Sequence, residues 1–391
     1  MSNALINSPV LKWARLRSHL DIEFVAKRVS VKVEKLMKWE SGEAVPTFRQ
    51  AQNLANVLHI PFGYLFLKEP PIEKLLLPDL RTIDDEFYAD FSVDLREVIS
   101  NVIIKQDWYK DYRRDQEYPE ISFIEKFNDN TENDVIVQEI TELLKLTFKD
   151  RESVQNWENF YQLLVERAES LGLWIMRASI VGSNTHRRLD VNEFRGFAIC
   201  DKIAPAIFIN GADAKAAQIF TLIHEIVHLW FGSSGVSNID FRKNINSFQN
   251  NREKKCNEIA AEILVPKEML QKMWDKRTFI SENAENLCRV FKVSSIVIAR
   301  RALDLGLVYP EDFFGYYKTL VEIWNIQKQK QKESGGGPSY YVNIPINNGR
   351  RFSMEVLNSV YSQNLLMRDG AKLLGLNPAT LNNFAKEVGI R

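Results

Sequence analysis

The chain has 391 residues, and its 51 Lys and Arg balance its 51 Asp and Glu. This balance excludes a global attraction to nucleic acid or membrane, so any DNA contact must come from a local basic patch. Hydrophobic residues make up 45% of the chain, which is enough for two or three domain cores. Three widely spaced Cys exclude a disulfide framework and a Cys-type zinc site. With no secretion signal and no apolar run long enough for a bilayer, we expect a cytoplasmic protein without a membrane partner.

Residues 1–68 are expected to form a small helical unit. Helices are predicted over 9–20, 22–29, 31–40, 47–58 and 61–67, with Asp21 and Ser30 as N-caps and Thr47 opening the fourth. Val29 and Ser30 join the second and third helices, and Ala26 lies where the two must pack closely. This arrangement is typical of a helix-turn-helix.

The sequence of this unit is similar to a known family. Lys38-Trp39-Glu40-Ser41-Gly42, followed by Pro46-Thr47, resembles the signature of the XRE (Cro/cI-type) repressor family. The resemblance implies double-stranded DNA as a partner, with the third helix in the major groove. Ten Lys or Arg against five Asp or Glu in residues 1–68 suit phosphate contacts. The candidate DNA contacts are Lys27, Arg28, Lys32, Lys35 and Lys38. A homodimer would match two half-sites, and a protein-docking role is the alternative.

A second domain is expected over residues 79–325, with its core at about 165–310. Pro70, Pro71 and Pro78 mark a stiff linker before it. Helices are predicted over 94–112, 132–146 and 154–171, and strands over 173–177, 194–200 and 206–210. This lead-in carries no motif to which we assign chemistry.

The segment that follows contains His224-Glu225-Ile226-Val227-His228. Its 18 residues after Asp213, a plausible N-cap, contain no Pro or Gly and are apolar on every side, which predicts a buried helix. His224 and His228 share a face because they are four residues apart. Burial of two imidazoles and a carboxylate is costly, and a bound metal cation offsets that cost. H-E-x-x-H on a helix is the zinc-hydrolase arrangement, in which Glu225 is the general base.

A third ligand is expected from the helix predicted over 250–266. Glu253, Asn257 and Ala260 or Ala261 lie on one stripe of it, and the small alanines allow close approach to the His helix. With the Leu264-Val265-Pro266 ending, this pattern resembles the ImmA/IrrE family of zinc metallopeptidases. The resemblance implies that Glu253, thirteen residues before Pro266, is the carboxylate ligand of one Zn²⁺ per chain. Glu258 and Glu262 are rival carboxylates that we expect to face the surface.

The remaining segments carry no chemistry that the sequence reveals. Residues 280–291 and 293–305 look like a second helix-turn-helix, but we expect them to complete the peptidase core. Residues 327–338 are predicted to be a flexible linker. A small third module over 339–391 is predicted to have a strand at 340–344, a helix at 352–363 and a helix pair at 367–374 and 378–388, with Asn377 as a cap. Its role, docking of a partner protein or of a substrate, is left open.

The expected architecture is α+β and mostly helical: a five-helix helix-turn-helix head, then a zincin-like domain whose small antiparallel sheet packs on the H-E-x-x-H helix. The resemblances imply a zinc endopeptidase and transcriptional regulator that cleaves a repressor or related regulator in a stress, mobile-element or phage response. Two alternatives remain open. One is an antitoxin that neutralises a partner toxin and represses its own promoter. The other is a transcription factor that uses the peptidase-like domain as a sensor.

Overall fold

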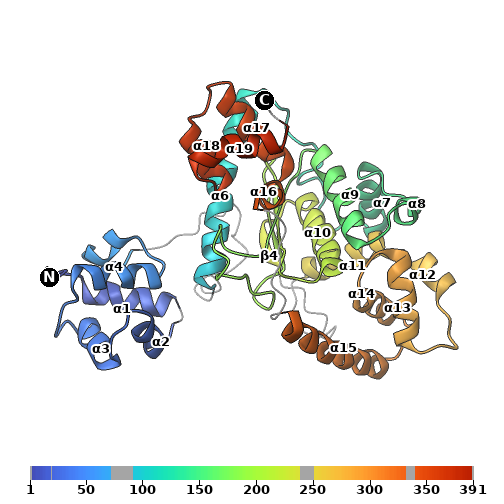
Figure 1. The fold of residues 1–391 in the computed structure, drawn as a ribbon. Coiled ribbons are helices and arrows are strands. Elements are labelled where there is room, and N and C mark those ends of the chain that lie inside the picture. Colours follow the sequence, from blue (N-terminus) through green and yellow to red (C-terminus); the bar gives the residue numbers. More distant parts are fainter. Residues whose placement is uncertain (1, 19, 72–90, 238–250, 332–339, 390–391) are drawn as a thin grey trace. The chain divides into compact units, whose positions relative to one another are not determined.

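The computed structural model describes residues 2–18, 20–71, 91–237, 251–331 and 340–389 (Figure 1). The chain divides into two compact units, and the division falls between Ile103 and Ile104, within the helix α6 (Val93–Asp115). The predicted linker before this helix lies mostly outside the described residues. The two units are described separately below.

The first unit begins with the predicted five-helix head. Its elements are α1 (Ser8–Arg17), α2 (Ile22–Arg28), α3 (Val33–Ser41), α4 (Phe48–Val57) and the 3-10 helix η1 (Phe62–Phe66). Thr47 caps α4 in a capping box with Gln50, as its position predicts. Ser30 is not a cap, however. It adopts a left-handed conformation with φ 57° in the turn, and the N-cap of α3 is Lys32.

A small apolar core holds the head together. Leu11, Ala26, Leu36, Trp39 and Leu54 are each 0–1% exposed and belong to one cluster. The bidentate contact of Arg15 with Glu40, at 2.7 and 2.9 Å, joins α1 to α3 at the edge of this core. The family signature residues Trp39 and Glu40 therefore stabilise the head. The opposite side of α3, with Lys35 and Lys38, is exposed to solvent.

The second unit opens with helices that support the sheet and the His helix. They are α7 (Asn133–Leu143), α8 (Phe148–Ser153) and α9 (Trp157–Ser170). The single helix predicted over 154–171 begins only at Trp157, because Asn156 caps α9 and accepts a hydrogen bond from the Asn159 N–H. Both α7 and α9 direct their apolar stripes into the main core.

The sheet has four strands in the order β1-β3-β2-β4: β1 (Trp174–Ala178), β2 (Gly196–Ile199), β3 (Ala206–Asn210) and β4 (Gly235–Ser237). It is mixed, whereas an antiparallel sheet was expected: β1 runs parallel to β3, and only β2 pairs antiparallel with β3 and β4. The chain passes from β1 to β2 through residues 179–195, and β2 runs opposite to β1. The next strand, β3, turns back antiparallel to β2 and lies between the two, so it runs parallel to β1. The fourth strand, β4, was not predicted, since its three residues carry too little pattern.

The central helix α10 (Lys215–Trp230) follows β3. It contacts α9 and α11 (Asn251–Leu264) and the strands β2 and β3, so protein surrounds it (Figure 1). This accounts for its apolar residues on every side. Its N-cap is Ala214 and not Asp213, because the Asp213 carboxylate pairs with Arg195 at 2.6 Å.

Four helices complete the domain after α11: α12 (Lys267–Met273), α13 (Ile280–Phe291), α14 (Ser295–Asp304) and α15 (Pro310–Gln331). The α13 and α14 helices lie in the main core, as expected for this second helix-turn-helix-like segment. The predicted flexible linker is wrong at its start, because α15 continues to Gln331; residues 332–338 lie outside the described part. In the described part of the chain, no helix has the length and hydropathy needed to cross a bilayer.

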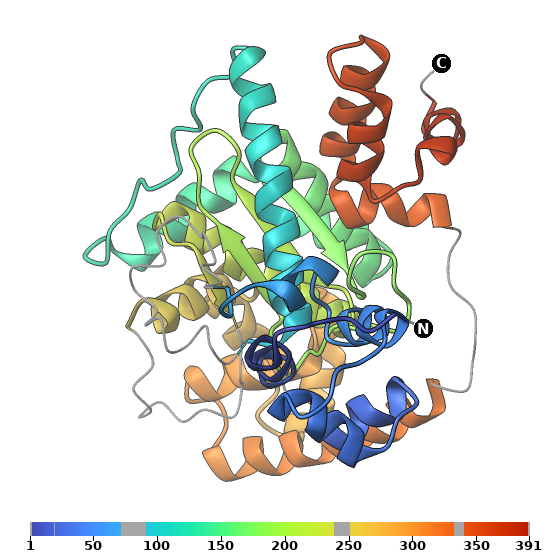
Figure 2. The ribbon, with the colours of Figure 1, turned by 90° about the vertical axis from the view of Figure 1, so that its left-hand side faces the viewer.

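The C-terminal module consists of α16 (Tyr340–Asn348), α17 (Arg350–Tyr361), α18 (Met367–Leu374) and α19 (Pro378–Glu387). These helices form a group of their own beside the sheet (Figure 2). The strand predicted at 340–344 is wrong: the segment is the helix α16, which packs against the edge strand β1. The short apolar run allowed either assignment, and this tertiary packing decides it. Asn377 caps α19, as predicted.

Candidate metal centre

Two imidazoles meet at the centre of α10. His224 is 0% and His228 is 5% exposed, and their Nε2 atoms lie 2.9 Å apart. The spacing of four residues along the helix brings the two rings together, as the sequence predicts. Burial lowers the pKa of His224 below its ordinary value, so its lone pair remains available for a metal.

Glu253 completes this group from the first turn of α11. Its carboxylate oxygens lie 3.3 Å from Nε2 of His224 and 3.2 Å from Nε2 of His228. Although burial opposes it, the pull of the two imidazoles holds the pKa of Glu253 well below its usual range. The close approach of α11 that this requires comes from Ala260, which is 0% exposed against the core.

The three side chains fit one metal ion. One donor atom from each lies within 4.8 Å of the other two. Zinc ligands lie about 2.0–2.2 Å from the metal, so donors of one tetrahedral site are about 3.3–3.6 Å apart, close to the separations of 2.9–3.3 Å between these atoms. Two neutral nitrogens and one carboxylate oxygen also form the donor set that leaves a fourth position open. His224, His228 and Glu253 are therefore brought together as predicted.

The rival carboxylates are occupied elsewhere. Glu258 accepts a hydrogen bond from Asn133 at 3.2 Å, and Glu262 pairs with Arg301. Each lies on a face of α11 turned away from the two imidazoles.

Glu225 lies next to the group on the same helix. It is 0% exposed, and the polar groups near it are His228, Ser237 and Glu253. Burial raises the pKa of Glu225 to about 8. Such a carboxylate holds a proton readily, which suits a group that accepts a proton and later gives it up.

Three neighbours of the site were missed in the sequence. Ser233 Oγ lies 3.0 Å from Nδ1 of His228, and Cys256 Sγ lies 3.8 Å from the same nitrogen. Gly196 of β2 faces Glu225: a Cβ built there would lie 3.3 Å from Oε1 of Glu225 and 2.7 Å from Cγ2 of Thr221. The sequence signal for Gly196 was its place inside a predicted strand, because a glycine there often marks a close approach by another part of the structure.

The predicted DNA contacts form a separate cluster in the head. Lys27, Arg28, Lys32, Lys35 and Lys38 are all exposed, at the end of α2 and along the outer side of α3. Lys35 lies over the ring of Trp39 at 5.6 Å, and Arg28 over that of Phe24 at 5.4 Å. In these two exposed residues the charged group itself lies over an aromatic ring, as in a cation–π contact.

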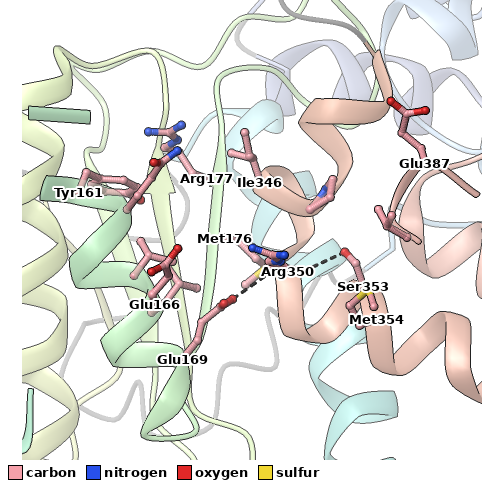
Figure 3. A pocket seen from close by; sticks show the side chains of 16 residues that line it. Tyr161, Glu166, Glu169, Met176, Arg177, Ile346, Arg350, Ser353, Met354 and Glu387 are labelled. Atoms are coloured by element: carbon pink, nitrogen blue, oxygen red, sulfur yellow. Dashed lines mark hydrogen bonds between the residues drawn. The ribbon is translucent and has the colours of Figure 1, made fainter. Parts of the chain in front are cut away.

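A cavity of about 610 Å³ lies between the C-terminal module and the elements α9 and β1 (Figure 3). Its walls include Glu169 on α9, Arg177 on β1, and Ile346, Arg350 and Glu387 on the module. None of the lining residues belongs to the His224, His228 and Glu253 group, so this cavity is separate from the candidate metal centre.

Comparison with family models gives three matches. Residues 11–65 match a helix-turn-helix family, residues 168–303 match the IrrE N-terminal-like domain of the M78 peptidases, and residues 348–387 match a domain described only as of unknown function. Comparisons with curated proteins and with solved structures gave no significant match. The chain is thus a fusion of an XRE-type helix-turn-helix domain with an ImmA/IrrE-like peptidase domain.

Proposed function

We propose that the chain is a zinc-dependent endopeptidase and a DNA-binding transcriptional regulator. The observation that carries the first half is the convergence of His224, His228 and Glu253, within 4.8 Å of one another, beside the buried carboxylate of Glu225. The two imidazoles and the Glu253 carboxylate contact one another, and a bound metal cation would further offset the cost of gathering these polar groups in the interior.

The hydrolytic mechanism assigns a role to each of these residues. His224, His228 and Glu253 would hold one Zn²⁺, which polarises a peptide carbonyl and lowers the pKa of a water molecule toward neutrality. Glu225 accepts a proton as the water oxygen attacks the carbonyl carbon. It then delivers that proton to the leaving amine nitrogen as the C–N bond breaks.

The sheet supplies a place for an extended substrate. Among the described strands, β4 lies at the edge of the sheet opposite β1 and pairs only with β2. Its neighbour β2 packs against α10, which carries the metal ligands. A peptide that pairs with this edge would be laid along the catalytic helix. We propose a cytoplasmic repressor or related regulator as the substrate, cleaved in a stress, mobile-element or phage response.

DNA binding is proposed for the head through Lys27, Arg28, Lys32, Lys35 and Lys38. The family match at 11–65 and the exposure of all five cations support this assignment. Lysines at these positions suit phosphate contacts more than base recognition. A homodimer would place two heads on two half-sites.

Two variants separate the activities. Glu225→Gln should reduce cleavage of a repressor-like substrate by at least about a hundredfold while DNA binding stays at the parent level, because the amide cannot accept a proton. Lys35→Glu with Lys38→Glu should do the reverse. Cleavage and promoter binding are measured on both proteins.

The other readings predict different outcomes. If Glu225→Gln keeps every cellular activity of the parent, the peptidase assignment is wrong. The interpretation as a transcription factor that uses this domain as a sensor is then favoured. Protection from a co-expressed toxin that survives Glu225→Gln would favour the antitoxin reading.

A further inference from the structure

The C-terminal module contains a second pair of helices with the geometry of the head. In the head, α2 and α3 are joined by a turn through Ser30; in the module, α18 and α19 are joined by a turn through Gly375. Both residues are left-handed, with φ 57° and 69°. The two segments can be compared residue by residue at a constant offset of 345, which the residue numbers themselves give.

The hydrogen bonds of the two turns correspond at this offset. The N–H of Ser30 donates to the Lys27 carbonyl at 3.2 Å, and that of Gly375 donates to the Lys372 carbonyl at 3.1 Å. One residue later, Val31 N–H donates to Ala26 O at 2.9 Å. In the module, Leu376 N–H donates to Ala371 O at 2.8 Å. This pair of bonds is a common way for a helix to end, so the likeness of the two segments depends on their buried side chains as well.

The buried side chains correspond as well. Both segments have a small residue where the helices cross and a larger apolar residue at or just after the end of the first helix. Both also have two apolar residues of the second helix in the core. These pairs are Ala26 and Ala371, Val29 and Leu374, Leu36 and Leu381, and Trp39 and Phe384, all 0–5% exposed. The module thus repeats a helix-turn-helix in its core as well as in its turn.

Turns of this kind end other helices of the chain as well, and the one between α13 and α14 shows why the outer face matters. Lys292, between α13 and α14, is left-handed with φ 56°, and Val293 N–H donates to Cys288 O at 3.2 Å. Its second helix is buried on several sides, however: Ile296, Val297, Ile298, Ala299, Arg301 and Ala302 are each 0–8% exposed. No groove of DNA could reach α14, so the turn alone does not make a DNA reader.

The second helix of the module has an open outer face. Ala379, Asn382, Asn383 and Lys386 on α19 are exposed, and their spacing of three and four residues places them on one side. The Tyr361 hydroxyl donates to Asn382 Oδ1 at 2.9 Å and holds that side chain in place. Asparagine is the residue that pairs with the adenine edge in the major groove.

Charged residues around this face suit a nucleic acid. Residues 348–387 contain five Lys or Arg against three Asp or Glu. Lys372 on α18 is exposed and lies on the helix that would cross the phosphate backbone, whereas the exposed Arg368 of the same helix pairs with Asp369 at 3.3 Å. The lysine-rich α3 suits phosphate contacts, whereas α19 offers amides that distinguish bases.

We propose that α18 and α19 form a second DNA-binding helix-turn-helix, with α19 as its recognition helix in the major groove of double-stranded DNA. One chain then carries two DNA-reading units on either side of the peptidase domain in sequence. The α19 unit supplies base recognition that the lysines of α3 lack.

The test uses the full-length chain and a pool of randomised DNA duplexes, with sequencing of the bound fraction. Three proteins are compared. The first is the head variant, Lys35→Glu with Lys38→Glu. The second adds Asn383→Asp and Lys386→Glu to the head variant, and the third adds Asn101→Asp and Lys318→Glu to it instead. The last pair changes the same residue types at exposed positions on α6 and α15 and is the matched control. Equal thermal unfolding midpoints of the three proteins establish that each is folded.

The head variant should still enrich duplexes with a common base pattern, and its affinity for them should fall steeply with salt. Adding the α19 changes should reduce that affinity by about tenfold or more and erase the pattern, while the control leaves both unchanged. The proposal is overturned if the head variant enriches no pattern, or if the α19 variant selects the same duplexes as the control. Retained DNA selection together with loss of a protein partner would make α19 a protein-docking helix instead.

Discussion

At the scale of single residues, Gly196 limits the space behind Glu225. A methyl group there would lie 2.7 Å from Cγ2 of Thr221 on α10 and 3.1 Å from the carbonyl oxygen of Phe208 on β3. We predict that Gly196→Ala lowers the free energy of unfolding by about 1–3 kcal/mol and reduces cleavage, because α10 must shift. Gly235→Ala on β4 is the control, since no heavy atom lies within 4 Å of its added Cβ. Thermal unfolding of both variants checks this, and an unaltered Gly196→Ala protein would contradict it.

Ser233 orients the second imidazole. Its Oγ lies 3.0 Å from His228 Nδ1 and 3.2 Å from the His228 carbonyl oxygen, so it can hold the ring with Nε2 toward the metal centre. Partners of this kind raise metal affinity by about 10–100-fold. Ser233→Ala should therefore weaken zinc binding by about tenfold, measured by competition with a chelator, while the fold stays intact. An unchanged zinc affinity would assign the orientation of His228 to Cys256 alone.

His224 and His228 were predictable because helix periodicity fixes how they face each other, whereas Glu253 was predicted from the resemblance to the ImmA/IrrE family. Their outer partners were not, since Ser233 and Gly196 meet the site only through tertiary folding. Similarly, Asp213 looked like a helix cap but pairs with Arg195 instead. Local propensity gives the candidates for a cap, and a charged neighbour distant in sequence decides among them.

At the scale of elements, the long helices and the three longer strands were predictable from their apolar periodicity, whereas β4 and α16 were not. Three residues carry no period, and the segment 340–348 becomes helical although Pro345 lies inside it. This helix packs against β1, which lies far away in the sequence. Gly349, with φ 82°, makes the close contact: an added Cβ would lie 2.8 Å from the Ile175 carbonyl oxygen.

The joint between α9 and the C-terminal module should respond to pH through Glu169. Its carboxylate accepts a hydrogen bond from the Arg350 N–H at 3.2 Å, at the wall of the cavity between the two parts (Figure 3). Burial raises the pKa of Glu169 to about 7, against about 4.3 in an unfolded chain. The folded state therefore binds this proton more tightly, and the free energy of unfolding should fall as the pH rises from about 4.3 to about 7.

Glu169→Gln removes this dependence, because the amide keeps an acceptor for Arg350 and has no charge to bury. We predict that the variant and the parent differ little at low pH, and that above neutral pH the variant is more stable by about 1 kcal/mol or more. Thermal unfolding of both proteins across this range is the measurement. The same difference between the two proteins at every pH would show that Glu169 does not lose its proton in the folded state.

At the scale of the whole molecule, the chain joins a DNA-binding head to a peptidase-family domain and adds a further helical module. The sequence predicts the first two from motifs, because Trp39 with Glu40 and His224 with His228 each combine a fixed spacing with a physical role. The module has no such motif, and its likeness to the head emerges only from the left-handed turn at Gly375 and the buried anchors around it.

The central claim is a zinc site made by His224, His228 and Glu253. Elemental analysis of the purified chain tests it most directly, with the parent measured beside His228→Ala and Glu253→Ala and with Glu268→Gln on the exposed side of α12 as the control. We predict about one zinc per chain in the parent and control and almost none in the other two, because two ligands do not hold zinc at a three-ligand site. A parent without metal after zinc has been supplied, or ligand variants that keep it, would contradict the account.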